Sequence, residues 1–271
     1  MADEPAGAGA GPVVLCGVDG GVATVTLNRP ERMNAWNVEM EERYFSTLDA
    51  LAADPEVRAI VVTGAGRGFC PGLDMDDLAG ASQGRPARDA SRTMLHALGV
   101  MKPMVAAVNG ACAGIGLVQA LACDVRFAAS SARMSTSFAR RGLVAEFGAP
   151  WFLERIVGHA NALDLLLSAR TIDAAEACDL GLVNRVVDTD RLLDEATAYA
   201  RDIATNCSPV ALAAIKRQVY DDWFRTAAAS EDEWRRLIAQ PHRRSDFREG
   251  VASYLEKRPP RFAPYAGTDP G

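Results

Sequence analysis

Several patterns that mark metal-binding, redox-active or secreted proteins are missing from this sequence. The six cysteines and three histidines are spread along the chain, and no two cysteines form a CxxC pair. Zinc sites and disulfide frameworks need such residues at close and regular spacings. We therefore expect no bound metal, and thiols that stay reduced as they do in the cytoplasm.

An excess of basic residues is also missing. Asp and Glu number 35 against 29 Lys and Arg, which gives a formal net charge of −6. Proteins that bind nucleic acids usually carry basic surfaces, so we expect no nucleic-acid partner.

No segment has the composition of a membrane span or of a signal peptide. The apolar run 104–123 is nearly long enough to cross a bilayer, but its glycines, Asn109 and Gln119 favour a buried element of a globular domain. The N-terminal stretch MADEPAGAGAG is acidic and lacks the basic and apolar regions of a signal peptide. We therefore expect no membrane partner and a cytoplasmic location.

What the sequence does contain is the composition of an ordinary globular domain. Hydrophobic residues make up 49% of the 271 residues, and charged residues make up 24%. Short apolar strands dominate the first half of the chain, and helical patterns dominate its C-terminal part. We expect a flexible tail over 1–12, a core over 13–200, a helical region over 201–262 and a second tail over 263–271.

Hydrophobic periodicity and turn residues predict the individual elements. Strands are expected at 13–18, 22–27, 59–63, 104–108, 124–128 and 182–187. Helices are expected at 37–53, with Asn37 as the N-cap, and at 86–100, 149–157, 160–168, 173–180, 190–205, 208–224, 229–240 and 245–257.

Two glycine-rich stretches follow strands of the expected core. The strand 104–108 leads through 109–116 into a helix, and the strand 59–63 leads through 64–72 into a short helix. Such turns leave backbone N–H groups pointing at one spot, and the helix dipole adds positive charge there. Two of them can converge on one oxygen that gains charge during a reaction. A pair of close-packed turns without a ligand is the alternative, and it stays open at this point.

Longer motifs in these regions resemble a known family. GRGFCPGLDMDDL (66–78) and VNGACAGIGLVQALACDVRFA (108–128) look like the two signature loops of the crotonase superfamily, the enoyl-CoA hydratases and isomerases. LNRPERMNA (27–35) resembles the family's first CoA-contacting segment, and further landmarks follow through GLVAEFG (142–148) as far as residue 262. The resemblance implies an α/β fold, a crotonase-like spiral of ββα turns with two near-perpendicular sheets and a helical C-terminal region.

The resemblance also implies an enzyme that binds acyl-CoA thioesters. The backbone N–H groups of Leu73 and Ile115 are expected to form an oxyanion hole for the enolate that arises when a proton leaves the carbon next to the thioester. Coenzyme A is part of the substrate, so no separate cofactor is expected. The residues expected to contact CoA or the acyl group are Arg29, Arg32, Met33, Ala35, Gly72, Asp74, Met75, Gly114, Val118, Phe138, Tyr254 and Lys257.

The sequence departs from the hydratase pattern at the catalytic carboxylates. Hydratases of the family use two glutamates to add water across a double bond, and those positions align here with Val118 and Phe138. Neither side chain can transfer a proton. Glu146 remains, in the position where some enoyl-CoA isomerases of the superfamily carry their single acidic residue. We therefore expect Δ3-to-Δ2 enoyl-CoA isomerisation, with Glu146 as the only acid/base group.

Three alternatives stay open. An enoyl-CoA hydratase of fatty acid β-oxidation could use a non-standard pair, Glu146 with Asp76 or Asp77. A member of the fold that has lost catalysis would bind acyl-CoA only. Glu146 could instead have a structural role, in which it caps the helix that begins near Ala149 or forms an ion pair with that helix.

The C-terminal helices are expected to serve assembly and CoA binding. Relatives form trimers, or hexamers as dimers of trimers, through these helices, and the apolar helix faces here are consistent with burial between subunits. In the family a C-terminal aromatic residue and a lysine reach the CoA nucleotide, often across a subunit boundary. Those positions look like Tyr254 and Lys257, and the alternative for Lys257 is a solvated helix end.

Overall fold

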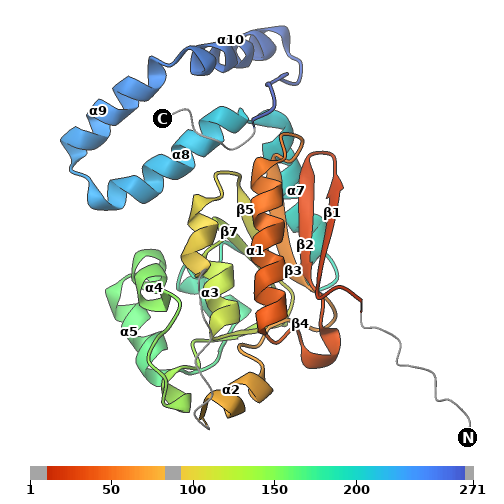
Figure 1. Cartoon of the computed structure of the whole chain (residues 1–271). Coiled ribbons are helices and arrows are strands. Elements are labelled where there is room, and N and C mark those ends of the chain that lie inside the picture. The colour runs from red at the N-terminus through yellow and green to blue at the C-terminus, as the bar shows by residue number, and fades with distance from the viewer. Residues whose placement is uncertain (1–10, 83–92, 266–271) are drawn as a thin grey trace, which may run out of the picture.

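The computed structural model describes residues 11–82 and 93–265. Within them the chain forms two β-sheets, helices that cover the sheets, and a group of three C-terminal helices at one end (Figure 1). The expected α/β architecture with two sheets and a helical C-terminal region is therefore confirmed.

The larger sheet is built on the apolar runs that the sequence predicts as strands. In spatial order its strands are β1 (Val14–Asp19), β2 (Val22–Leu27), β3 (Ala59–Gly64), β5 (Met104–Val108), β7 (Val125–Ala129) and β10 (Arg185–Val187). β1 and β2 form an antiparallel hairpin, and all the other neighbours are parallel. Every residue of β3 and β5 is buried, as expected for parallel strands covered on both faces. All six predicted strands are confirmed, the last of them only over 185–187.

The sequence does not predict the smaller sheet. In spatial order its strands are β4 (Gly68–Cys70), β6 (Ala111–Ala113), β8 (Arg133–Ser135) and β9 (Ile172–Asp173). Strands of two or three residues are too short to show an alternation of polar and apolar side chains. β4 and β6 pair in parallel inside the two glycine-rich stretches, so each stretch contains a strand as well as a turn.

The helices around the sheets begin and end close to the predicted residues. They are α1 (Val38–Ala53), α2 (Met75–Ser82), α3 (Ile115–Leu121), α4 (Ala149–Val157), α5 (His159–Ser168), α6 (Ala174–Asp179) and α7 (Leu192–Asn206). The Asn37 side chain caps α1 by accepting a hydrogen bond from the Met40 amide at 2.9 Å, as predicted. Of the helix predicted over 86–100, the part up to residue 92 lies outside the described residues, and Met94–Gly99 forms a 3-10 helix.

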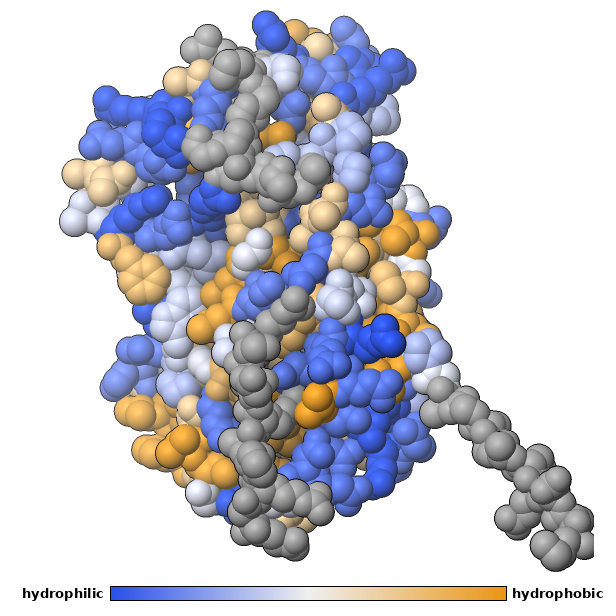
Figure 2. Space-filling model, viewed as in Figure 1, coloured by the Kyte–Doolittle hydropathy of each residue, from blue (hydrophilic) through white to orange (hydrophobic). Residues whose placement is uncertain are grey.

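The C-terminal group consists of α8 (Pro209–Asp221), α9 (Ala227–Ile238) and α10 (Pro241–Glu256). The predicted boundary between residues 200 and 201 cuts through α7, which packs against β3 and β5, so the group begins only after α7. Lys216 of α8 is bound to the core through Asp124, at 2.8 Å. Figure 2 shows hydrophobic side chains in the zone where the group meets the core. In the described ranges no helix is long and apolar enough to span a membrane.

Candidate active site

The two glycine-rich stretches meet at Gly72 and Gly114. Their φ angles are 123° and 53°, a region that residues with a side chain rarely adopt. A Cβ placed on Gly114 would lie 3.8 Å from the Gly72 Cα, and a Cβ placed on Gly72 would lie 3.5 Å from the carbonyl oxygen of Ala113. The residues that follow the two glycines, Leu73 and Ile115, are therefore close in space.

The backbone of Leu73 is oriented by Trp36. The Trp36 amide donates a hydrogen bond to the Gly72 carbonyl at 2.8 Å, and the Asp74 amide donates one to the Trp36 carbonyl at 2.9 Å. Peptide groups alternate in direction along an extended chain, so the N–H of Leu73 points to the side opposite Trp36. Trp36 is fully buried and provides a fixed support for this orientation.

Ile115 is the first residue of α3, where helix geometry leaves the backbone N–H without a partner inside the helix. Gly116 allows this first turn to approach β4, because a Cβ on Gly116 would lie 2.1 Å from the carbonyl oxygen of Cys70. Within residues 11–82 and 93–265, no acceptor takes a hydrogen bond from the amide of Leu73 or of Ile115. Both amides are thus available to an oxygen in front of α3.

A cavity of about 230 Å³ opens at these two amides. Much of its wall is apolar and includes Leu78, Leu143 and Phe147. The residues predicted for the site that line the cavity are Arg32, Ala35, Gly72, Leu73, Asp74, Met75, Gly114, Ile115, Phe138 and Glu146. Four segments that are distant in the sequence therefore converge on one cleft.

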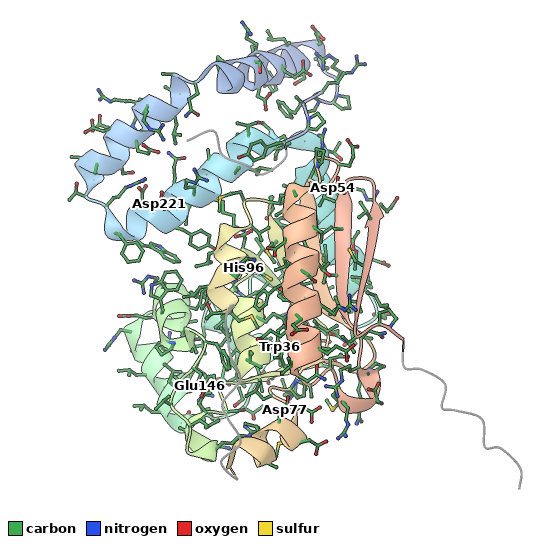
Figure 3. The ribbon with its side chains drawn as sticks, viewed as in Figure 1. Trp36, Asp54, Asp77, His96, Glu146 and Asp221 are labelled. Atoms are coloured by element: carbon green, nitrogen blue, oxygen red, sulfur yellow. The ribbon has the colours of Figure 1, made fainter. Side chains whose placement is uncertain are left out.

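Glu146 reaches the cleft from the loop that precedes α4. Phe147 and Gly148 both have positive φ, 58° and 81°, so the chain turns sharply between the glutamate and the helix. The N-cap of α4 is Gly148, without a side-chain capping hydrogen bond, so Glu146 does not cap this helix. In the described part of the chain its half-buried carboxylate forms no hydrogen bond or ion pair. Figure 3 shows Glu146 at the same end of the molecule as Trp36, away from α9 and α10.

Asp74, the second carboxylate in the cavity wall, is already engaged. Its Oδ2 pairs with Arg29 at 2.9 Å, and its Oδ1 accepts a hydrogen bond from the Asp76 amide at 3.1 Å. Burial opposes ionisation of Asp74, but the Asp76 amide and the Arg29 charge outweigh it and lower the pKa of Asp74. Asp74 is therefore a fixed anion rather than a proton carrier.

The acidic residues considered as partners for Glu146 lie elsewhere. Asp76 and Asp77 are exposed on α2 and do not line the cavity. Asp76 pairs with Arg32 at 3.1 Å, with both side chains more than half exposed. No second free carboxylate therefore faces the cavity from the described residues.

The thiols beside the two stretches are also unsuited to proton transfer or attack. Cys70 and Cys112 are fully buried. Burial raises the pKa of Cys70 to about 12 and raises the pKa of Cys112 well above its ordinary value. Both side chains remain neutral thiols.

Five residues predicted for the site lie outside the cavity wall. The guanidinium group of Arg29 forms an ion pair with Asp74, and neither Arg29 nor Met33, four residues further along, lines the cavity. Val118 is buried within α3. Tyr254 and Lys257 are exposed at the C-terminal end of α10. In Figure 1 this helix lies at the end of the molecule opposite α2. Contacts of these residues with CoA stay predictions.

Sequence reasoning also missed residues that line the cavity. Leu143 and Phe147 flank Glu146 within the motif GLVAEFG, and that position was the available signal. Thr136 and Ser137 come from the segment after β8. That strand has three residues, so the sequence gives no indication that the segment returns to the cleft.

Comparisons with known proteins show which family the chain resembles. The family model described as enoyl-CoA hydratase/isomerase matches residues 17–264. The 1,2-epoxyphenylacetyl-CoA isomerase of Escherichia coli strain K12 is 36% identical over 257 residues, which cover 92% of this chain and 97% of the relative. A probable enoyl-CoA hydratase of Rhodobacter capsulatus is 40% identical over 247 residues, which cover 89% of this chain and 94% of the relative.

A solved structure extends the match to three dimensions. The crystal structure of a probable enoyl-CoA hydratase/isomerase from Mycobacterium abscessus superposes with a TM-score of 0.83 at 33% sequence identity. The superposition covers 93% of this chain and 99% of that one. The chain therefore belongs to the enoyl-CoA hydratase/isomerase family, in the crotonase superfamily.

Proposed function

We propose that the protein isomerises 3-enoyl-CoA to 2-enoyl-CoA, with Glu146 as the single acid/base group. One observation carries the proposal: among the described residues, a single free carboxylate, that of Glu146, lines the cavity that opens at the Leu73 and Ile115 amides. The two relatives are named an isomerase and a probable hydratase, so their names do not decide between the reactions. The choice therefore rests on the carboxylates of this chain.

The proposed reaction needs one base and one oxyanion hole. Glu146 removes a proton from C2 of the 3-enoyl thioester, and the electron pair moves onto the thioester oxygen. The amides of Leu73 and Ile115 donate hydrogen bonds to that oxygen while its charge grows. When the enolate collapses, the double bond shifts to C2–C3 and Glu146 returns the proton to C4. No atoms are gained or lost, so a second acid is not required.

The charges at the cavity suit a thioester of coenzyme A. Arg32 and Arg141 line the cavity, and both are exposed. Two guanidinium groups beside an apolar cleft favour a ligand with phosphates at one end and an acyl chain at the other. In this proposal CoA belongs to the substrate, and no further cofactor takes part.

A direct test follows the conversion of trans-3-hexenoyl-CoA to the conjugated 2-enoyl thioester by ultraviolet absorbance. Glu146→Gln keeps the size of the side chain but removes the base, so we expect turnover to fall by about 10²- to 10⁴-fold. Binding of an acyl-CoA analogue, measured by calorimetry, should change little. Asp77→Asn is the matched control, because Asp77 is exposed on the neighbouring helix α2 and lies outside the cavity.

Two other outcomes would replace the proposal. Rapid hydration of 2-enoyl-CoA by the wild-type protein would identify a hydratase with a non-standard acid/base arrangement. Binding of acyl-CoA without turnover of either substrate would identify a member of the fold without catalysis.

A further inference from the structure

A largely buried ion pair joins the segment 29–36 to Asp74, the residue that follows Leu73. Arg29 Nη2 lies 2.9 Å from Asp74 Oδ2, and the two side chains are only 15% and 7% exposed. Arg29 Nη1 donates a second hydrogen bond, at 2.6 Å, to the carbonyl of Ala35. One guanidinium group thus ties the end of the segment 29–36 to the residue that follows Leu73.

Asp74 is held at three points. Besides the contact with Arg29, its Oδ1 accepts from the Asp76 amide at 3.1 Å, and its own amide donates to the Trp36 carbonyl at 2.9 Å. The peptide group that joins Leu73 to Asp74 therefore has little freedom to rotate. The N–H of Leu73 belongs to the preceding peptide group, which joins Gly72 to Leu73 and whose carbonyl accepts a hydrogen bond from the Trp36 amide at 2.8 Å. By binding the Ala35 carbonyl and the Asp74 carboxylate together, Arg29 holds the Trp36 segment beside this peptide group.

We propose that Arg29 and Asp74 are positioning residues, whose ion pair fixes the direction of the Leu73 N–H in the oxyanion hole. The inference rests on the proposed function, because it gives that N–H its role. It differs from the expectation that Arg29 contacts CoA. Two of the donor nitrogens of Arg29 are already bound within the protein, and the side chain does not line the cavity. Small errors in the placement of a catalytic group cost large factors in rate, so the anchor affects chemistry more than binding.

The first test is Asp74→Asn, which keeps the shape of the side chain and removes its charge. The carboxamide oxygen can still accept from the Asp76 amide, but the ion pair with Arg29 is lost. We expect kcat for isomerisation to fall by about 10- to 10²-fold, less than the roughly 10²- to 10³-fold typical of losing an oxyanion-hole donor. KM should stay nearly unchanged, because the N–H contributes most in the transition state.

Asp76→Asn is the matched control, two residues further along the chain, in α2. Asp76 makes a similar contact with Arg32, but that pair is exposed, with 53% of Arg32 and 78% of Asp76 accessible. Exposed ion pairs of this kind contribute little to the stability of the folded structure. We expect kcat of this variant to match the wild type, because the Arg32–Asp76 pair does not hold the segment beside Leu73.

A second readout reports the oxyanion hole without turnover. A cinnamoyl-CoA with an electron-donating amine on its ring absorbs at longer wavelength when its thioester carbonyl is polarised. We expect the wild-type protein and Asp76→Asn to shift its absorbance to longer wavelength, and Asp74→Asn to lose most of that shift. Arg29→Lys keeps the positive charge, but one ammonium group cannot bind both the Ala35 carbonyl and Asp74 in the geometry of the guanidinium group. We therefore expect an intermediate shift in absorbance for this variant.

The outcomes separate the two proposals. If the wild-type protein binds the chromophore without a shift, the oxyanion hole and the proposed function are wrong. If the wild type gives the shift and both Asp74→Asn and Arg29→Lys reproduce its shift and kcat, only the positioning inference is wrong. Circular dichroism checks that each variant is folded, and Arg29→Lys decides the question if Asp74→Asn does not fold.

Discussion

At the scale of single residues, the surroundings decide what each acidic side chain can do. Asp74 and Glu146 both line the cavity, but Asp74 is bound to Arg29 and to a backbone amide. Glu146 has no such partner among the described residues and is half-buried. The same carboxylate chemistry thus gives a structural anchor at one position and a proton carrier, in our proposal, at the other.

Gly116 provides a prediction at the same scale. A Cβ at this position would lie 2.1 Å from the Cys70 carbonyl oxygen, so in Gly116→Ala either α3 or β4 must move. We expect a loss of about 1–3 kcal/mol in the free energy of unfolding, measured by urea denaturation, together with a large loss of activity because the Ile115 amide shifts. Gly99→Ala is the control, since a Cβ there meets nothing within 4 Å. Equal stability of the two variants would disprove the close contact.

At the scale of elements, the two ends of α1 show different ways of supplying hydrogen-bond partners to backbone groups that have none within the helix. Asn37 caps its beginning, which the sequence predicts. Lys102, from the segment before β5, covers its end by donating to the carbonyls of Leu51 and Asp54. The second contact joins residues that are about 50 positions apart, so no local sequence pattern predicts it.

Lys102→Met tests this contact. Removing the ammonium group leaves two carbonyls without a donor, so we expect the free energy of unfolding at pH 7 to fall by about 1–3 kcal/mol. Lys257→Met is the control, because Lys257 is exposed. A variant as stable as the wild type would show that water replaces the donor at no cost.

The pH dependence of stability gives a separate prediction for Lys102. Burial, opposed by the Asp54 charge, lowers its pKa from 10.5 to about 8 in the folded chain. Between pH 8 and 10.5 the unfolded chain therefore binds more protons than the folded chain, and the contribution of Lys102 to the free energy of unfolding rises with pH. The difference between wild type and Lys102→Met should widen over this window in urea titrations. A constant difference would contradict the lowered pKa.

At the scale of the whole molecule, the C-terminal helices carry apolar side chains that the described part of the chain leaves exposed. Phe247, Tyr254 and Leu255 of α10 are 72%, 84% and 73% exposed. Exposed apolar groups of this size are typical of interaction surfaces. They support the expectation of a trimer or a hexamer, in which α10 of one chain could bring Tyr254 and Lys257 to the cleft of another.

Assembly can be measured by light scattering of the purified protein. We expect a mass of three or six chains, and we expect Phe247→Glu to yield smaller species because a charge is buried at the interface. Leu167→Glu is the control, since Leu167 is 74% exposed on α5, outside the C-terminal group. A monomeric wild-type protein at micromolar concentration would rule out this role for α10.

The sequence by itself determined the elements that have a strong local signal. The long apolar strands, the cap at Asn37 and the order of the family motifs are visible without coordinates, because each depends on residues close together in the chain. The same motifs indicated Leu73, Ile115 and Glu146 as candidate site residues.

Only the tertiary structure decided which of these residues meet and which are already occupied. The second sheet has strands too short for a pattern, and it places β4 beside β6 so that Gly72 and Gly114 come together. The binding of Arg29 to Asp74 joins residues 45 positions apart. Such contacts arise from the path of the whole chain, and residue type and spacing do not encode them locally.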